Sequence, residues 1–98
     1  MYRIVYIKQT ETDIKNLKAA GLSMKVKELI KIIRDDPFRN PPSYESLVGH
    51  LEGFYARRIN IKHRLVYQVY GGNEKNDETK YEGTIKIVSM WTHYDGLR

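Results

Sequence analysis

The sequence predicts an α+β fold with the element order βααβββ, in which two helices pack on one face of an antiparallel sheet. Apolar residues recur at helical spacing only after a short strand-like run at the N-terminus. Three runs rich in β-branched and aromatic residues then follow a proline-rich segment. A length of 98 residues with 41% hydrophobic content fits one domain spanning residues 1–98.

The N-terminal third predicts a strand and a short helix. Residues 2–7 are rich in β-branched and aromatic side chains, and alternate positions share one face. Thr10 followed by Asp13 resembles a helix N-cap, and Gly21 ends the amphipathic pattern after it. We therefore expect the first helix between Thr10 and Gly21.

A second helix follows immediately. Ser23 is a candidate cap, and Pro37 excludes helical continuation. Its apolar stripe comprises Leu22, Val26, Leu29, Ile30 and Ile33. Residues 36–44 carry three prolines and predict a loop that leads back into the core.

The rest of the chain predicts an antiparallel meander from strand-like runs at residues 53–60, 63–70 and 81–92. A three-residue loop, 60–62, would place Arg58 opposite Arg64 and point both away from the face that carries Ile59. This register leaves one face to the helices and the other open. A two-residue loop would break that separation.

Positive charge is concentrated in the first of these hairpins. Eight residues without an acid carry four cations, whereas the whole chain has a net charge of +5. The cations are Arg57, Arg58, Lys62 and Arg64. A focused cationic patch edged with aromatic residues suits a phosphodiester partner, although basic composition alone also fits an acidic protein.

Several classes of function find no support. The chain has no cysteine, which excludes disulfides and cysteine zinc sites and is usual in a reducing compartment, so we expect the cytoplasm. No apolar run approaches the roughly 20 residues that span a bilayer, and residues 2–7 are too short for a signal-peptide core. The three histidines lie 13 and 30 residues apart and match no compact metal motif, and no phosphate-loop motif is present.

One combination of motifs is more specific. The run from Pro37 to Tyr67 contains Pro37-Phe38, Glu45, Leu47, Gly53-Phe54, Arg57-Arg58 and the sequence HRLVY starting at His63. The pair His93-Tyr94 lies near the C-terminus, four residues before the end of the sequence. Together these closely resemble the YoeB/Txe toxins of the RelE superfamily. The resemblance implies a RelE-like microbial RNase fold and a type II toxin that cuts mRNA in the ribosomal A site. It also implies neutralisation by a YefM-like antitoxin.

The resemblance implies a role for each matched position. Glu45 would be the general base, Arg64 would stabilise the phosphate, His93 would be the general acid, and Tyr94 would orient or assist the acid. These groups suit metal-independent and cofactor-independent attack of a ribose 2′-OH on the adjacent phosphodiester, which leaves a 2′,3′-cyclic phosphate. Arginine suits the phosphate because its planar fork binds two oxygens.

The remaining cations and aromatic residues have less specific assignments. We expect Arg58 in the active site and Arg57 at its rim or in contact with the antitoxin, with Lys62 also holding RNA. His63 is a further candidate, against the plainer interpretation of a turn histidine that packs locally. Tyr44, together with Tyr94, is a better candidate for base stacking than the strand tyrosines.

Two other functions fit the same scaffold. The protein could be a non-catalytic inhibitor resembling the ParE toxins or a plain RNA-binding module, and the sequence leaves homodimer formation open.

The sequence departs from the family pattern at three places. Val48 stands where many relatives have lysine, so one cation near the active site is either missing or replaced by Lys62 or Arg39. The connection at residues 71–81 is long and charged, and residues 95–98 extend past the tyrosine that ends many relatives.

Overall fold

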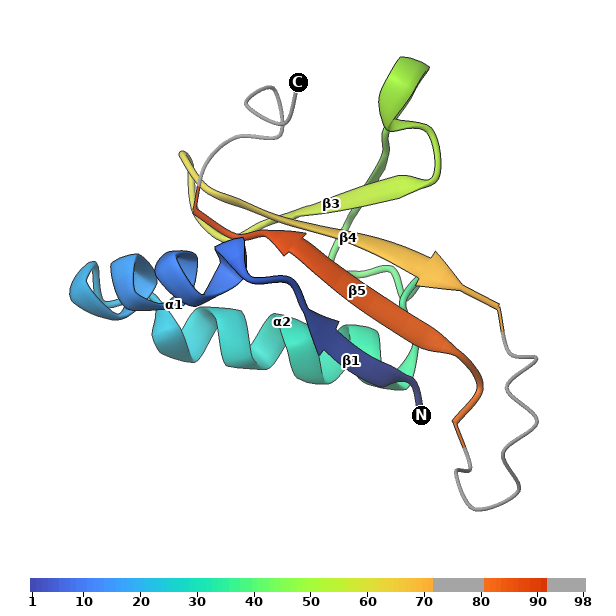
Figure 1. Ribbon diagram of the computed structural model, residues 1–98, viewed down its shortest axis with the longest axis horizontal. Helices are drawn as coiled ribbons and strands as arrows, with labels where there is room; N and C mark the ends of the chain where they lie inside the picture. Colours follow the sequence, from blue (N-terminus) through green and yellow to red (C-terminus); the bar gives the residue numbers. More distant parts are fainter. Residues whose placement is uncertain (72–80, 92–98) are drawn as a thin grey trace.

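The computed structural model describes residues 1–71 and 81–91. Their elements are β1 (Arg3–Tyr6), α1 (Gln9–Ala19), α2 (Ser23–Asp35), β2 (Glu45–Ser46), the 3₁₀ helix η1 (Gly49–Leu51), β3 (Phe54–Arg58), β4 (Arg64–Tyr70) and β5 (Thr84–Ser89). The strands form one sheet in the order β1-β5-β4-β3-β2 (Figure 1). Within the described ranges, neither helix is long and apolar enough to cross a membrane.

The predicted α+β class is confirmed, with one strand and two helices before the remaining strands, but four strands rather than three follow the helices and the sheet is mixed rather than antiparallel. β1 pairs with β5 in parallel, whereas β5, β4, β3 and β2 pair antiparallel with one another. The strand-like pattern of residues 2–7 carries no information about its partner, which lies about eighty residues further along the chain. β1 lies beside β5 at the edge of the sheet (Figure 1).

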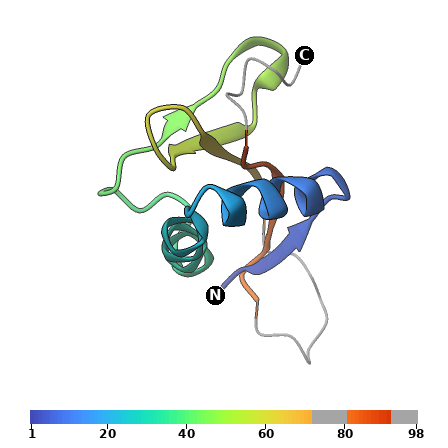
Figure 2. The same cartoon turned by 90° about the vertical axis from the view of Figure 1, so that its left-hand side faces the viewer.

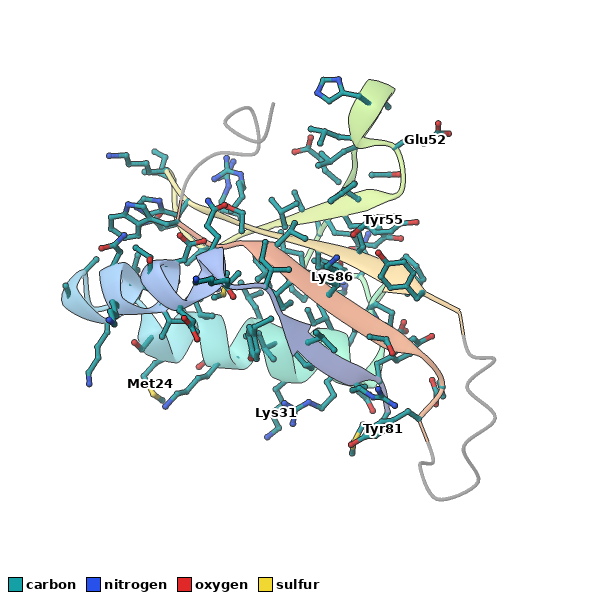
Figure 3. All side chains as sticks on the ribbon, in the orientation of Figure 1. Met24, Lys31, Glu52, Tyr55, Tyr81 and Lys86 are labelled. Atoms are coloured by element: carbon teal, nitrogen blue, oxygen red, sulfur yellow. The ribbon has the colours of Figure 1, made fainter. Side chains whose placement is uncertain are left out.

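Both helices cover the same face of the sheet, as the view along α2 in Figure 2 makes clear. Helix α2 buries four residues of the expected stripe, whereas Leu22 precedes the helix and is half-buried. Met24 and Lys31 project away from the sheet (Figure 3). The predicted caps are wrong in detail. Ser23 is the first residue of α2 rather than its cap, and Thr10 lies inside the first turn of α1, where its hydroxyl donates to the carbonyl of Ile7.

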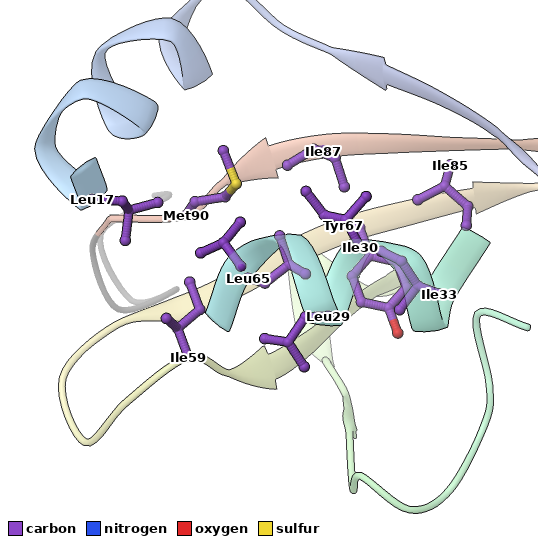
Figure 4. Packing of buried hydrophobic residues seen from close by; sticks show 11 residues of the cluster. Leu17, Leu29, Ile30, Ile33, Ile59, Leu65, Tyr67, Ile85, Ile87 and Met90 are labelled. Carbon is purple, nitrogen blue, oxygen red and sulfur yellow. The ribbon is translucent and has the colours of Figure 1, made fainter. Parts of the chain in front are cut away.

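The main core fills the space between these helices and the sheet (Figure 4). Its buried members are Leu17, Val26, Leu29, Ile30, Ile33, Ile59, Leu65, Tyr67, Ile85, Ile87 and Met90. Alternate residues of β4 and β5 point into it, as period-two patterning requires. Burial of these side chains supplies the hydrophobic stabilisation on which a chain without disulfides depends.

The opposite face of the sheet is not fully open, contrary to our prediction. A second, smaller cluster of buried residues covers part of it, formed by Leu47, Ala56, Val66 and Val88. Ile7, Leu51 and Phe54 pack against this cluster. The segment that contains β2 and η1 therefore folds over this face instead of passing it as a plain loop, and only the remaining surface is available to a ligand.

The β3–β4 hairpin has the predicted register. Arg58 is paired with Arg64, and the backbone N–H of Ile59 donates to the carbonyl of His63 at 3.0 Å, which closes a three-residue loop. The side-chain oxygen of Asn60 accepts hydrogen bonds from the backbone N–H groups of Lys62 and His63. An asparagine that bonds its own backbone in this way favours a tight turn.

Candidate active site

A polar cleft of about 370 Å³ lies over the end of the sheet formed by β2, β3 and β4. It is lined by Ser43, Tyr44, Glu45, Ala56, Arg58 and Arg64. The cleft therefore joins the carboxylate and both arginines that the sequence placed in the site. Neither Lys62 nor Arg39 lines it, and Val48, 82% exposed, lies outside it as well.

Strand pairing explains why these residues meet. Glu45 is paired with Ala56, and Arg58 is paired with Arg64. Paired residues point to the same face of a sheet, as do residues two apart on one strand. Ala56 and Arg58 therefore bring the carboxylate of Glu45 and the guanidinium of Arg64 onto one face, beside the smaller apolar cluster.

Arg64 is held by its own hairpin loop. Its Nη1 donates to the carbonyls of Asn60 at 2.9 Å and His63 at 3.2 Å. Its Nε and Nη2 make no hydrogen bond within residues 1–71 and 81–91. Nη1 thus holds the side chain in place, while Nε and Nη2 remain as donors to an anion. Bidentate binding of a phosphate requires two such donors on one guanidinium group.

Arg58 and Arg64 make the cleft cationic. Arg58 is exposed, and within the described residues it forms no ion pair. Two like charges opposite each other on neighbouring strands are mildly destabilising. A bound phosphate would relieve that repulsion, so this pair favours an anionic ligand.

Arg57 has a different environment, and its predicted place at the rim of the RNA site is wrong. Its side chain is 1% exposed. Nε donates to the hydroxyl of Tyr67, and the two terminal nitrogens donate to the carbonyls of Pro37, Arg39 and Pro42 at 2.6–3.0 Å. Arg57 therefore holds the proline-rich loop against β3, and it presents no free surface to a phosphate.

Two tyrosines complete this buried arrangement. The Tyr67 hydroxyl donates to the Pro37 carbonyl at 2.8 Å, and the Tyr44 ring lies against the Arg57 guanidinium with its centroid 5.0 Å away. Burial raises the pKa of the Tyr67 phenol, and the hydrogen bond and positive charge of Arg57 partly oppose that effect. The phenol consequently remains a neutral donor at physiological pH.

His63 is also buried rather than available to RNA, so that part of our prediction is wrong. It is 5% exposed, and its ring stacks on Trp91 with a centroid distance of 4.0 Å and an interplanar angle of 18°. Burial lowers the pKa of its imidazole, and the nearby charge of Lys62 acts in the same direction. A neutral, packed histidine fits the plainer interpretation of a local packing residue.

The two C-terminal candidates, His93 and Tyr94, lie outside the described residues. The described chain leads toward them through Met90, whose backbone N–H donates to the buried carboxylate of Asp13 at 3.0 Å, and through Trp91. Among residues 1–71 and 81–91, no group of three or more His, Cys, Asp or Glu side chains could hold a metal ion.

The family model of the YoeB-like toxin of bacterial type II toxin-antitoxin systems matches residues 6–94. The chain belongs to this family. It is 42% identical to the toxin YoeB of Escherichia coli K12 over 64 residues, which cover 65% of this chain and 69% of that toxin.

Solved structures of YoeB proteins have the same fold. The YoeB–YefM complex of Staphylococcus aureus matches with a TM-score of 0.70 and 32% identity, covering 96% of this chain and 99% of that one. The YoeB dimer of the same organism matches with a TM-score of 0.72 and 31% identity, covering 95% and 98%. Relatives of this YoeB-like toxin have thus been crystallised both with YefM and as a dimer.

Proposed function

We propose that this YoeB-like toxin is a ribosome-dependent endoribonuclease that cuts mRNA in the A site and so inhibits translation. The observation that carries the proposal is the cleft in which Glu45, Arg58 and Arg64 share one face of the sheet. A carboxylate next to two guanidinium groups suits attack of a ribose 2′-OH on the neighbouring phosphodiester.

Each group has a role in that reaction. Glu45 accepts the proton of the 2′-OH as its oxygen attacks phosphorus, and Arg64 and Arg58 bind the phosphate oxygens on which negative charge develops. The bond from phosphorus to the 5′-oxygen breaks, which leaves a 2′,3′-cyclic phosphate. The family resemblance assigns protonation of the departing 5′-oxygen to His93, with Tyr94 assisting. Lys62, exposed on the hairpin loop, contacts the RNA backbone.

The partners follow from the same proposal. The substrate is mRNA held by the 70S ribosome, which places the toxin in the bacterial cytoplasm. A YefM-like antitoxin neutralises it, with acidic residues facing the exposed cations Arg58, Lys62 and Arg64. Two copies of the toxin associate as a homodimer, as the Staphylococcus aureus relative does in its crystals.

The test is cleavage of a defined message on purified ribosomes. Glu45→Gln keeps the size of the side chain and removes the base, and we expect a loss on the order of 10²- to 10⁴-fold. Glu52→Gln is the matched control, because Glu52 is an exposed glutamate that does not line the cleft. Unchanged cleavage by Glu45→Gln would contradict the assignment.

Two further arms separate the proposal from its alternatives. A message with a 2′-deoxyribose on the 5′ side of the cut should resist cleavage, whereas EDTA at concentrations that leave ribosomes intact should not protect an ordinary message. A ParE-like inhibitor or a plain RNA-binding module would produce no cyclic phosphate end in any arm. Cleavage of the deoxy message would exclude attack by the 2′-OH.

A further inference from the structure

We propose that the solvent-facing side of α2 is a second RNA-binding surface, separate from the cleft, and that it binds the phosphodiester backbone of ribosomal RNA. The inference rests on the proposed function, because it takes the ribosome as the place where the toxin acts. We call this region the α2 surface and define it by four exposed cations, Lys27, Lys31, Arg34 and Arg39. None of them lines the cleft.

Two adjoining hollows lie along this side of α2. One, of about 340 Å³, has Lys27, Lys31 and Arg34 in its wall. The other, of about 390 Å³, shares Lys31 and Arg34 with the first and adds Arg39, with Asp35 as the acid among its lining residues. Because the hollows share two residues, they form one concave and cationic surface.

Helix geometry explains why the cations gather there. Lys27, Lys31 and Arg34 follow one another at spacings of four and three residues, so they lie on one side of the helix. Lys31 projects away from the sheet in Figure 3. A rise of 1.5 Å per residue makes the row about 10 Å long. A small anion would reach one part of this row, whereas a polyanion such as an RNA strand contacts its whole length.

These cations are available to a ligand. Within residues 1–71 and 81–91, none of the four forms an ion pair. Arg39 is a contrast to Arg57, because its backbone carbonyl accepts a hydrogen bond from Arg57 Nη2 at 2.9 Å while its own side chain remains exposed. Neighbouring cations without acidic partners repel one another, and a bound polyanion relieves that repulsion and releases counterions.

The position of the α2 surface favours ribosomal RNA as its partner. Both helices cover one face of the sheet (Figure 2), and Glu45, Arg58 and Arg64 lie on the other. A message held in the cleft therefore leaves the α2 surface to a different strand, and a ribosome supplies ribosomal RNA. Tyr6, 44% exposed, lies in the wall of the first hollow and adds an aromatic ring, which suits a nucleotide better than an acidic peptide.

The test compares two variants that each lose three positive charges. The α2 variant carries Lys27→Gln, Lys31→Gln and Arg34→Gln. The matched control variant replaces three exposed helix cations that line neither hollow, by Lys15→Gln, Lys18→Gln and Lys25→Gln. Glutamine has nearly the helix propensity of lysine and arginine, so both variants should keep the urea unfolding curve of the wild type.

Toxin affinity is measured for 70S ribosomes programmed with a message that a 2′-deoxyribose at the cut site protects. Potassium chloride is varied at constant magnesium. We expect the α2 variant to bind on the order of 10- to 100-fold more weakly than the wild type at the lowest salt concentration. Its slope of log affinity against log salt should be smaller by about 2, since each phosphate contact contributes about 0.7–0.9.

The control variant should stay within about threefold of the wild type, because it has the same net charge as the α2 variant and lacks only cations outside the hollows. Equal affinities and slopes for the two variants would overturn the proposal. If the α2 variant unfolds at lower urea than the wild type, the pair Lys31→Gln and Arg34→Gln takes its place.

Poly-glutamate and message cleavage separate the remaining outcomes. An α2 variant that loses affinity for poly-glutamate but keeps that for ribosomes would identify the partner as an acidic protein and overturn the proposal. If the wild type cuts an unprotected message on ribosomes while the two variants bind alike, the α2 assignment alone is wrong. If the wild type does not cut that message, the proposed function fails and the inference that rests on it falls as well.

Discussion

Arg57 and Arg58 are neighbours in the sequence and lie on opposite faces of β3. Arg57 is buried against the proline-rich loop and bonded to three carbonyls and a phenol. Arg58 is exposed in the cleft opposite Arg64. The comparison shows that one basic motif can supply both a structural cation and a ligand-binding cation, because alternate residues of a strand face opposite ways.

This difference divides the hairpin into two regions with different tasks. The helix-facing side holds Arg57, Tyr67 and His63, all buried. The cleft side holds Arg58 and Arg64 beside Glu45. Substitutions on the first side should act on the free energy of unfolding, and substitutions on the second should act on RNA cleavage.

The largest expected effect on stability comes from Arg57→Met, which keeps an apolar stem and removes the guanidinium. The hydroxyl of Tyr67 and two carbonyls lose their donor, and the Pro37 carbonyl loses one of its two donors. We therefore expect the free energy of unfolding to fall by roughly 3–5 kcal/mol. Urea unfolding followed by circular dichroism measures this change. A loss below about 1 kcal/mol would mean that Arg57 does not hold the loop.

Tyr67→Phe removes a single hydroxyl from the same network. Arg57 Nε then lacks an acceptor and the Pro37 carbonyl loses one of its two donors, so we expect a loss of about 1–3 kcal/mol. The double variant with Arg57→Met should be less destabilised than the sum of the two single variants, because both remove the same hydrogen bond. Additive losses in urea unfolding would show that the two residues act independently.

His63 allows a pH test of the buried side. In the unfolded chain the imidazole has a pKa near 6.5, whereas burial lowers its pKa in the folded chain. The unfolded state therefore binds more protons as pH falls through 6.5, and this histidine reduces stability there by up to about 1.4 kcal/mol per pH unit. His63→Phe keeps a ring against Trp91 and should remove that contribution.

The measurement is the free energy of unfolding at pH 7.5 and pH 5.5 for the wild type and the variant. His63→Phe should lose less stability between the two values than the wild type does. His50→Gln is the control, because it replaces a histidine that is exposed rather than buried. Equal pH dependence in the wild type and His63→Phe would mean that His63 is charged or solvated in the folded protein, which would contradict its burial in a neutral form.

Local patterns in the sequence predicted the parts of the fold that depend on neighbouring residues. The stripe of α2 and the register of the β3–β4 hairpin follow from periodicity over a few residues. The same periodicity could also have located Arg57, because it lies two residues before the buried Ile59 and therefore shares its face. The clustering of positive charge gave no indication that Arg57 is buried and Arg58 exposed.

Other features depend on contacts between distant segments and left no local signal. The parallel pairing of β1 with β5 joins segments separated by the rest of the chain. The carbonyls that bind Arg57 lie 15–20 residues away, on a loop whose path the sequence does not specify. Glu45 and Arg64 were matched to the site through the family resemblance, and the strand pairing then supplied their common face.

The smallest effect on stability should come from Arg58→Ala, because an exposed arginine opposite a like charge contributes little to folding. We expect its free energy of unfolding to lie within about 0.5 kcal/mol of the wild type. Arg58→Lys serves as the comparison that keeps the charge and loses the planar fork.

The most direct test of this division is the single-turnover rate of message cleavage on ribosomes by Arg58→Ala, measured beside its unfolding curve. Because Arg58 lies on the cleft face of β3, we expect Arg58→Ala to fold normally and its cleavage rate to fall on the order of 10²-fold. The substitution removes a positioned cation near the transition state. Wild-type cleavage by Arg58→Ala, or a loss of stability as large as that of Arg57→Met, would contradict the assignment of the two arginines to different tasks.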